Sequence, residues 1–437
     1  MRPLLFRNAR VIDPSRHTDG IADLLVEEGR IVAVGRGIGT PDGALVRECT
    51  GKVVAPGLID LHVHLREPGQ EEAETIATGA MAAAAGGFTA VCAMPNTDPV
   101  TDNQAAVGFV VRQAIRAGKA RVHPIGAVSM RQEGERLAEF GELVGAGAVA
   151  VSDDGRPVVS SHLMRTALEY ARTFGIPVAD HCEDPTLAGG AMHEGLVATR
   201  LGLKGIPSAA EEIMVARDII LAELTGGHVH LCHMSTRGSV DLIRRAKERG
   251  LMVTAEATPH HFALTHDRCE GYDTNAKMNP PLREEEDRAA IREALRDGTI
   301  DVIASDHAPH HYDTKERAFA EAPNGIVGLE TALGLGIREL VVPGLLSLPE
   351  LLARMSTLPA RIFHLPGGTL AVGAPADLIV FDPDRRWTVR AEEFHSKSAN
   401  SPFLGETLVG RTELTLVDGR IIFEFELEPA EGQGRVQ

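Results

Sequence analysis

The chain has 437 residues, with 44 Lys and Arg against 61 Asp and Glu, which gives a formal net charge of −17 at pH 7. This acidic balance argues against a protein that binds nucleic acid or an anionic membrane, because affinity for phosphate comes from clustered Lys and Arg. Apolar residues make up 43% and aromatic residues 4%, so we expect a globular chain with an aliphatic core and no base-stacking surface.

The expected location is the cytoplasm. No uninterrupted apolar run approaches the ~18–20 residues of a membrane-spanning helix. The N-terminal stretch MRPLLFRNARVIDPS has no apolar core or cleavage site typical of a signal peptide. The five cysteines are scattered, and none forms a CxxC pair, so neither a disulfide framework nor a thiolate zinc site is expected.

Both ends of the chain predict short strands separated by turns. LLFRNARVID and ADLLVEEGRIVAVG occur within residues 1–55, and ADLIVFDPD and ELTLVDGRIIFEFE within residues 366–437. Asp-Pro and Gly breaks separate these runs. Because the two ends share one pattern, we expect them to pair into one small β-domain.

The middle of the chain, residues 56–365, alternates short apolar runs with helical patterns such as SHLMRTALEYARTF and EEEDRAAIREALRDG. The apolar runs are residues 57–64, 88–94, 121–128, 148–154, 176–181, 228–233, 251–257 and 301–306. Eight strands alternating with helices predict an α/β fold, a (β/α)8 TIM-type barrel. A doubly wound sheet is the competing interpretation, and it too would place a site at the carboxyl ends of its strands.

The first barrel run, GLIDLHVH, ends in two histidines. Side chains alternate along a strand, so His62 and His64 share one face, while the aliphatic Ile59, Leu61 and Val63 form the other and are expected to pack against helices. Two imidazoles on one face at the end of a strand can both reach a single metal ion. An HxH motif alone also occurs by chance, and the alternative interpretation is two polar residues at a barrel mouth without a metal ion.

Other predicted strands also end in histidine or aspartate. His181 ends the fifth run, His233 the sixth and Asp306 the eighth, while Asp153 and Asp154 follow the fourth in VSDDG. Barrel enzymes keep their active sites at this end of the strands. A set of His and Asp without Cys suits Zn²⁺, with Mn²⁺ or Co²⁺ as alternatives. Six candidate ligands exceed one tetrahedral shell, so two ions sharing a bridging carboxylate are expected.

The sixth run, HVHLCH, offers two sets of histidines. His228 and His230 share one parity with Cys232, whereas His233 has the opposite parity. Alternation allows only one set to point inward. We take His233 at the strand end as the candidate ligand and interpret His228 and His230 as solvated or structural.

These motifs, taken together, resemble a known family. The segments PGLIDLHVHLREPG, GGFTAVCAMPNTDP, VSDDG, VADHCED, GGHVHLCHMST, NPPLR, IASDHAPH and SKSANSPFLG are similar to those of bacterial dihydroorotases. The subclass is the longer one, within the amidohydrolase superfamily, and the resemblance runs over nearly the whole chain.

The resemblance implies a role for particular residues. Six of them would hold two zinc ions: His62, His64, Asp154, His181, His233 and Asp306. Seven would bind substrate: His64, Arg66, Asn96, Asn279, His310, Asn324 and Gly325. Many relatives bridge the two metals with a carbamylated Lys, and here Asp154 takes that place by analogy, with Asp153 as its neighbour.

The implied activity is that of a dihydroorotase in pyrimidine biosynthesis. Two metal ions would activate a bridging water that attacks the ring amide of dihydroorotate, and Asp306 would carry the proton to the leaving nitrogen, giving N-carbamoyl-aspartate. The polar segment 307–325 is predicted to be either a lid over the substrate or an ordinary surface excursion. The expected partners are the small-molecule substrate, a second copy in a homodimer and an aspartate transcarbamylase.

Two alternatives stay open at this point. One is another cyclic-amide hydrolase, such as a hydantoinase (dihydropyrimidinase) or an allantoinase. Those relatives usually carry the bridging Lys and lack the Arg of HxHxR, which here is Arg66. The other is a non-catalytic subunit of an aspartate transcarbamylase complex, which we would expect to have lost metal ligands.

Overall fold

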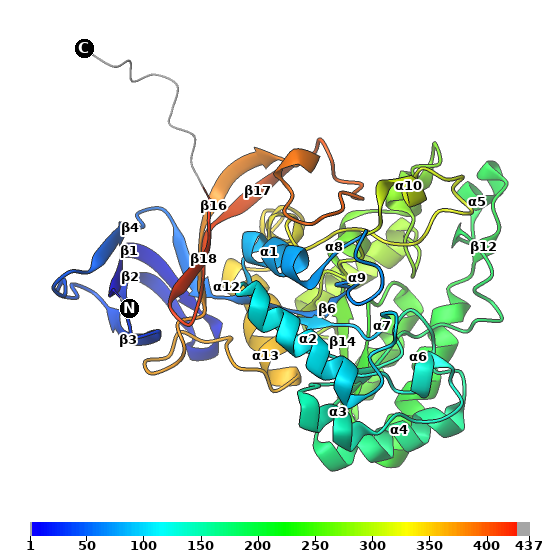
Figure 1. Cartoon of the computed structure of the whole chain (residues 1–437). Coiled ribbons are helices and arrows are strands. Elements are labelled where there is room, and N and C mark those ends of the chain that lie inside the picture. The colour runs from blue at the N-terminus through cyan, green and yellow to red at the C-terminus, as the bar shows by residue number, and fades with distance from the viewer. Residues whose placement is uncertain (1, 426–437) are drawn as a thin grey trace.

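The eight predicted runs form eight parallel strands in the computed structural model, which describes residues 2–425 (Figure 1). In chain order they are β6 (Leu58–Val63), β7 (Phe88–Ala93), β8 (Arg121–Pro124), β9 (Val151–Ser152), β10 (Val178–Asp180), β13 (Val229–Leu231), β14 (Val253–Ala257) and β15 (Val302–Ile303). Strands β6 to β8 form one sheet, and β9, β10, β13, β14 and β15 form another. Parallel bridges from Gly126 to Val151 and from Val63 to His307 join the two sheets at both seams. The strands therefore close into a ring, which confirms the barrel.

Helices follow the strands and surround the ring (Figure 1). They are α1 (Ile76–Gly86), α2 (Gln104–Ala117), α3 (Phe140–Ala146), α4 (Ser161–Phe174), α6 (Ala209–Thr225), α7 (Arg237–Glu248), α9 (Glu285–Asp297), α11 (Ala332–Gly336), η5 (Ile337–Val341), α12 (Leu348–Leu352), η6 (Ala353–Thr357) and α13 (Leu358–Ile362). The start of α1 is set by Thr75, whose hydroxyl accepts from the backbone N–H of Thr78 in a capping box. Left-handed Gly residues end six of these helices, as at Gly175 after α4.

Short elements extend the loops beyond the ring. They are η2 (Met130–Gln132), β11 (Met192–His193), α5 (Leu196–Leu201), β12 (Gly205–Ile206), α8 (Pro259–Ala263), η3 (His266–Cys269), η4 (Thr274–Ala276) and α10 (Tyr312–Lys315). Figure 1 places β12, α5 and α10 on the side of the barrel away from the N-terminal strands.

The interior of the barrel is a cluster of side chains contributed from around the ring. Ile59 and Leu61 lie in it beside Cys92 and Cys232, with Phe363 from the segment after α13. The alternation expected for the first strand is therefore wrong for Ile59 and Leu61, although Val63 does belong to the outer, helix-facing core. The reason is a register irregularity of β6 against β7 between Asp60 and Val63, because such a break interrupts strict alternation.

The two chain ends pair in one sheet, as predicted (Figure 1). Its order is β18-β17-β16-β5-β1-β2-β3, with β4 beside β1. The strands are β1 (Leu4–Asp13), β2 (Thr18–Glu27), β3 (Arg30–Gly35), β4 (Leu45–Glu48), β5 (Val53–Pro56), β16 (Leu378–Thr388), β17 (Thr407–Val417) and β18 (Arg420–Glu424), with η1 (Pro14–Arg16) and η7 (Ala391–Glu393) between them. Antiparallel pairing of β5 with β16, for example Val54 with Val380, joins the two ends.

The fold confirms the predicted class, a (β/α)8 barrel with a small β-domain from both termini. The domain limits at residues 55 and 366 remain predictions, and residues 426–437 of the C-terminal segment lie outside the described residues. Within residues 2–425, no helix is both long enough and apolar enough to cross a bilayer.

Candidate active site

Asp154 lies between two pairs of histidines at the carboxyl end of the barrel. Its Oδ2 is 3.4 Å from Nε2 of His62 and 3.4 Å from Nε2 of His64. Its Oδ1 is 3.3 Å from Nε2 of His233 and 3.8 Å from Nδ1 of His181. Histidines from the ends of three strands, β6, β10 and β13, thus meet around the carboxylate that follows β9.

Asp306 completes this group on the side of the first pair. Its Oδ1 lies 3.1 Å from Nε2 of His64 and 3.4 Å from Nε2 of His62. Burial raises the pKa of Asp306, but the charge of His62 and the hydrogen bond from His64 outweigh burial and lower that pKa to about 2. Asp306 is therefore ionised at neutral pH.

The donor set fits a divalent cation. The ligand atoms of His62, His64 and Asp306 lie within 4.8 Å of one another, and so do those of His62, Asp154 and His233. All these side chains are buried. Nε2 of His62, which faces both aspartates, has no hydrogen-bond partner among the described residues, and a buried imidazole nitrogen without a partner is costly unless a ligand satisfies it. Imidazole and carboxylate are suitable ligands for zinc.

Two of these side chains reach the site because the backbone leaves the strand conformation. His233 has φ +38° and Asp306 has φ +46°, a left-handed region that non-glycine residues rarely adopt and that is common at functional sites. The expectation that only one set of the HVHLCH histidines points inward is therefore wrong. Cys232 lies in the interior cluster, and His233 also turns into the site because the chain bends there.

The structural interpretation of His230 agrees with its contacts. Its Nδ1 lies 2.8 Å from Oγ1 of Thr254 and its Nε2 lies 3.1 Å from Oε2 of Glu256. His228 contacts the same Thr254 hydroxyl at 2.8 Å. Both histidines thus hold neighbouring strands together below the site.

The adjacent aspartates after β9 point to different partners. Asp153 accepts hydrogen bonds from the backbone N–H of Ser129 at 3.0 Å and from its hydroxyl at 2.5 Å. Burial raises the pKa of Asp153 to about 6. Of the two aspartates, Asp154 alone lies among the histidines. Burial opposes its ionisation, but the charge of His62 holds the pKa of Asp154 well below the usual range.

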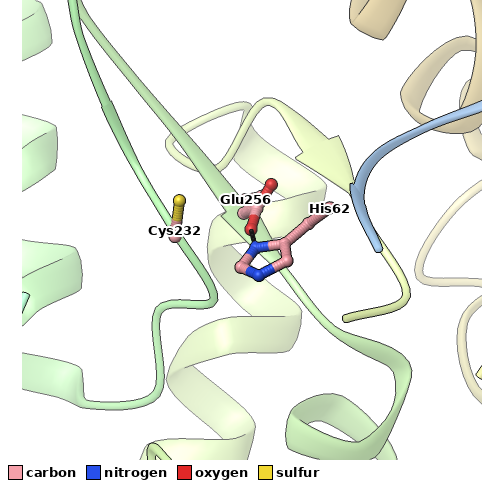
Figure 2. A group of neighbouring side chains, drawn as sticks. All are labelled: His62, Cys232 and Glu256. Atoms are coloured by element: carbon pink, nitrogen blue, oxygen red, sulfur yellow. Dashed lines mark hydrogen bonds and ion pairs between the residues drawn. The ribbon is translucent and has the colours of Figure 1, made fainter. Parts of the chain in front are cut away.

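Sequence reasoning missed Glu256, a fully buried acid on β14. Figure 2 shows its carboxylate facing the His62 ring, and Oε1 lies 2.6 Å from Nδ1 of His62. Oε1 also accepts from the backbone N–H of His233 at 3.2 Å. Cys232 is drawn beside this pair without an interaction. Glu256 therefore orients His62 so that Nε2 points at the two aspartates.

Three of the predicted substrate-binding residues, Arg66, His310 and Asn324, lie against one another. Arg66 donates from Nε to the carbonyl of Pro309 at 3.0 Å, and its Nη2 lies 3.3 Å from Nε2 of His310. His310 Nε2 in turn lies 2.8 Å from the carbonyl oxygen of Asn324. Burial lowers the pKa of Arg66 to about 10, so its side chain remains cationic at neutral pH.

The two asparagines contact histidines of the candidate metal site. Oδ1 of Asn96 lies 2.9 Å from Nδ1 of His64. Nδ2 of Asn279 lies 3.4 Å from Nε2 of His181 and donates to Glu183 at 3.2 Å. The acid Glu183, two residues after His181 in VADHCED, is a further side chain that sequence reasoning did not single out.

Two buried lysines bind backbone carbonyls of the segment 307–325. Lys277 donates to the carbonyls of Ala320 at 3.0 Å and Ala322 at 2.7 Å. Lys315 donates to those of Pro323 at 2.9 Å and Gly325 at 3.1 Å. Both lysines hold the backbone of this segment in place, and its role as a lid over the substrate remains a prediction.

Comparisons with known proteins identify the family of the chain. A family model described as dihydro-orotase-like matches residues 51–239. The chain is 54% identical over 420 residues to a dihydroorotase of Geotalea daltonii, covering 96% of this chain and 99% of the relative. It is 55% identical over 424 residues to a dihydroorotase of Anaeromyxobacter dehalogenans, covering 96% and 98%. Among solved structures, the L-hydantoinase (dihydropyrimidinase) of Arthrobacter aurescens superposes with a TM-score of 0.86 at 27% identity, covering 97% of this chain and 96% of that one.

Fold and site together define a metal-dependent cyclic amidohydrolase. Within that class, the chain belongs to the dihydroorotase family and has dihydroorotase function. The family predicted from the motifs is confirmed, and with it an enzymatic role in pyrimidine biosynthesis.

Proposed function

We propose that this site interconverts dihydroorotate and N-carbamoyl-aspartate, with Asp306 as the general acid and base. The observation that carries the proposal is the convergence of four histidines on Asp154 and Asp306 at the mouth of the barrel. The cyclic amide would enter from the side of Arg66 and His310.

The proposed cofactor is a pair of zinc ions. His62, His64 and Asp306 would hold one ion, His181 and His233 the other, and Asp154 would bridge them, since its two oxygens face different histidine pairs. When bound, such ions lower the pKa of a water toward ~7 and polarise a carbonyl.

Asp306 is the proposed proton carrier. Its pKa of about 2 leaves it ionised, so it accepts the proton from the attacking water as the new C–O bond forms. It then delivers that proton to the ring nitrogen as the amide C–N bond breaks. In the reverse direction, Asp306 removes the proton from the carbamoyl nitrogen.

Arg66 and His310 are the proposed recognition groups for the substrate carboxylate. The Arg66 guanidinium is buried and cationic, and it lies against His310 and the Pro309 carbonyl. A planar guanidinium suits bidentate binding of a carboxylate. This local charge explains how a chain with a net charge of −17 attracts an anion, because steering depends on the field near the site.

The substitution Asp306→Asn tests the proton-carrier role. Turnover of dihydroorotate should fall by about 10²–10⁴-fold, the usual contribution of a positioned acid or base, while dihydroorotate still binds in a calorimetric titration. Turnover equal to that of the zinc-loaded wild type would remove Asp306 from the mechanism.

Hydantoin hydrolysis is the second candidate activity, because the fold superposes on hydantoinases. Asp154 at the bridging position and Arg66 beside His64 favour dihydroorotate instead. Assaying the zinc-loaded enzyme with dihydroorotate, hydantoin and allantoin separates the candidates. Turnover of hydantoin or allantoin without turnover of dihydroorotate would decide against our proposal.

We also propose that the chain forms a homodimer and associates with an aspartate transcarbamylase. Three apolar side chains on one side of α6, Ile213, Ile220 and Leu224, are 48%, 63% and 62% exposed, and such patches often mark protein contacts. Light scattering, alone and with the transcarbamylase, should give the mass of a dimer and then of a complex. A monomer under both conditions would reject both associations.

A further inference from the structure

We propose that Asn400, from the segment between β16 and β17, is a positioning residue for the substrate-binding loops. It lies in the motif SKSANSPFLG, to which neither the fold nor the mechanism has given a role. The inference deepens the proposed function and rests on it, because the loops concerned carry His310, Asn324 and Gly325.

A single buried amide ties two loop segments together. Asn400 is 5% exposed. Its Oδ1 accepts from the backbone N–H of His310 at 3.0 Å, and its Nδ2 donates to the carbonyls of Ala308 and Gly325, both at 3.0 Å. The backbone N–H of Val327 donates to the carbonyl of Asn400 at 3.0 Å. The amide therefore uses both donors and its acceptor on backbone groups beside the proposed carboxylate site.

The loops meet too closely for this spacing to be adjustable. A Cβ at Gly325, where φ is +155°, would lie 2.6 Å from the carbonyl oxygen of Ala308 and 2.6 Å from Cδ2 of His310. Arg66 binds the intervening Pro309 carbonyl at 3.0 Å. Asn400 thus fixes the position of His310 relative to Arg66 and Gly325 without itself lying among the proposed ligands.

This geometry predicts a particular kinetic change. Loss of Asn400 would misplace groups that bind the carboxylate, which is present in the substrate, the transition state and the product. Uniform binding of this kind alters KM and leaves kcat nearly unchanged. Losing one or two buried hydrogen bonds that hold the binding groups should weaken the affinity for substrate about tenfold.

The experiment compares zinc-loaded wild type with Asn400→Ala and Asn400→Asp. The aspartate variant keeps the volume and the acceptor for the His310 N–H but loses both donors, so it remains informative should the alanine variant fail to fold. We expect KM to rise about tenfold for both dihydroorotate and N-carbamoyl-aspartate, with kcat within about twofold and zinc content unchanged.

Ser398→Ala is the matched control. Ser398 lies in the same segment and is also buried, but its hydroxyl donates to the carbonyl of Ala73 at 2.7 Å, away from the loops that carry His310 and Gly325. The KM of the Ser398→Ala variant should equal that of wild type. An unchanged KM in the soluble Asn400 variants, or a loss of kcat and zinc without a rise in KM, overturns the inference.

A binding measurement separates this inference from the proposed function. Dihydroorotate is titrated into Asp306→Asn and into the same variant carrying Asn400→Ala. About tenfold weaker binding in the second protein supports the positioning role even if the wild type turned over a different cyclic amide. Equal affinities would overturn it whatever the wild-type activity.

Discussion

At the scale of single residues, Glu256 shows how a buried acid outside the ligand set shapes the site. It binds Nδ1 of His62 at 2.6 Å and Nε2 of His230 at 3.1 Å. A carboxylate behind a metal-binding imidazole fixes the orientation and tautomer of the ring and raises its basicity. The charge of His62 and its hydrogen bond in turn hold the pKa of Glu256 far below the usual range, despite burial.

Glu256→Gln should weaken zinc binding by about 10–100-fold. The amide keeps the volume, but it loses the negative charge and turns an N–H₂ group toward one of the two imidazoles. Competition with a chromogenic chelator measures the affinity. Cys92→Ala is the control, since Cys92 is buried in the same interior cluster as Cys232 but belongs to none of the side-chain groups among the described residues that could hold a metal ion. Wild-type affinity in Glu256→Gln would contradict the orienting role.

His193 gives the fold a defined acid sensitivity outside the metal site. Its side chain is buried, and Nδ1 lies 3.1 Å from Nη1 of Arg283. Burial, together with the charge of Arg283, lowers the pKa of His193 from 6.5 to about 3. The folded protein therefore keeps this ring neutral at pH values where the unfolded chain protonates it. The resulting stability is fully present above pH 6.5 and is lost as the pH falls from 6.5 toward 3.

The prediction is that His193→Gln has a flatter stability profile. Between pH 6.5 and pH 5 the wild type should lose about 1–2 kcal/mol more unfolding free energy than the variant, because each unit of pKa difference is worth ~1.4 kcal/mol. Urea unfolding of both proteins at pH 6.5 and pH 5 measures this difference. The same measurement on both proteins at pH 8 corrects for any general loss of stability in the variant. Parallel profiles for the two proteins would refute the assignment.

Residue patterns explain why the site was only partly predictable. Strand-end histidines and aspartates stand out because chemistry collects at that end of a barrel. Asp153 and Asp154 are neighbours with the same side chain, and only the position of Ser129 in space distinguishes them. Glu256 does not end a predicted strand. The sequence marks it only as an acidic residue inside the apolar run TAEA.

At the scale of elements, strand alternation was a good guide until the backbone departed from regular geometry. The predicted run of β6 was correct, but the register irregularity between Asp60 and Val63 breaks the alternation, so Ile59 and Leu61 lie inside the barrel whereas Val63 faces the helices. The left-handed turn at His233 similarly lets two residues of opposite parity face inward. Both departures depend on tertiary contacts that no local pattern encodes.

A second element-level feature is the contact between β8 and the β-domain. Arg121 donates from Nη2 to both oxygens of Asp377 at 3.0 Å and from Nη1 to Asp418 at 3.0 Å. The Asp377 side chain is only 4% exposed, so its negative charge is stabilised mainly by Arg121 and not by water. Arg121 begins β8, at the end of the barrel opposite the site.

Arg121→Ala should therefore destabilise the fold without impairing catalysis. Leaving Asp377 without its cation should cost about 1–3 kcal/mol, seen as a lower Tm, while kcat stays at the wild-type value. Arg165→Ala is the comparison, because Arg165 forms an exposed pair with Glu169 four residues along α4, and such pairs contribute less than about 0.5 kcal/mol. Equal melting temperatures for the two variants would contradict this assignment.

At the scale of the whole molecule, the barrel was predictable because its signal repeats eight times along the chain. Pairing of the two ends followed from their shared strand pattern, and β5 beside β16 confirms it. The tie from Asn400 to the loops at Ala308 and Gly325 spans 92 and 75 residues. A contact at that separation leaves no periodic signal, so sequence alone gave the motif but not its role.

The proposed metal site would also link much of the ring. Its proposed ligands lie at the ends of β6, β9, β10, β13 and β15, so cations bound there would hold five strands at once. A ligand that binds only the folded state at 1,000 times its Kd stabilises it by about 4.1 kcal/mol. Removing zinc with a chelator should therefore abolish turnover and lower the Tm by several degrees. Added Zn²⁺ should restore both, whereas Mg²⁺, which prefers oxygen ligands, should not. Unchanged activity and Tm after complete chelation would show that no metal is needed here.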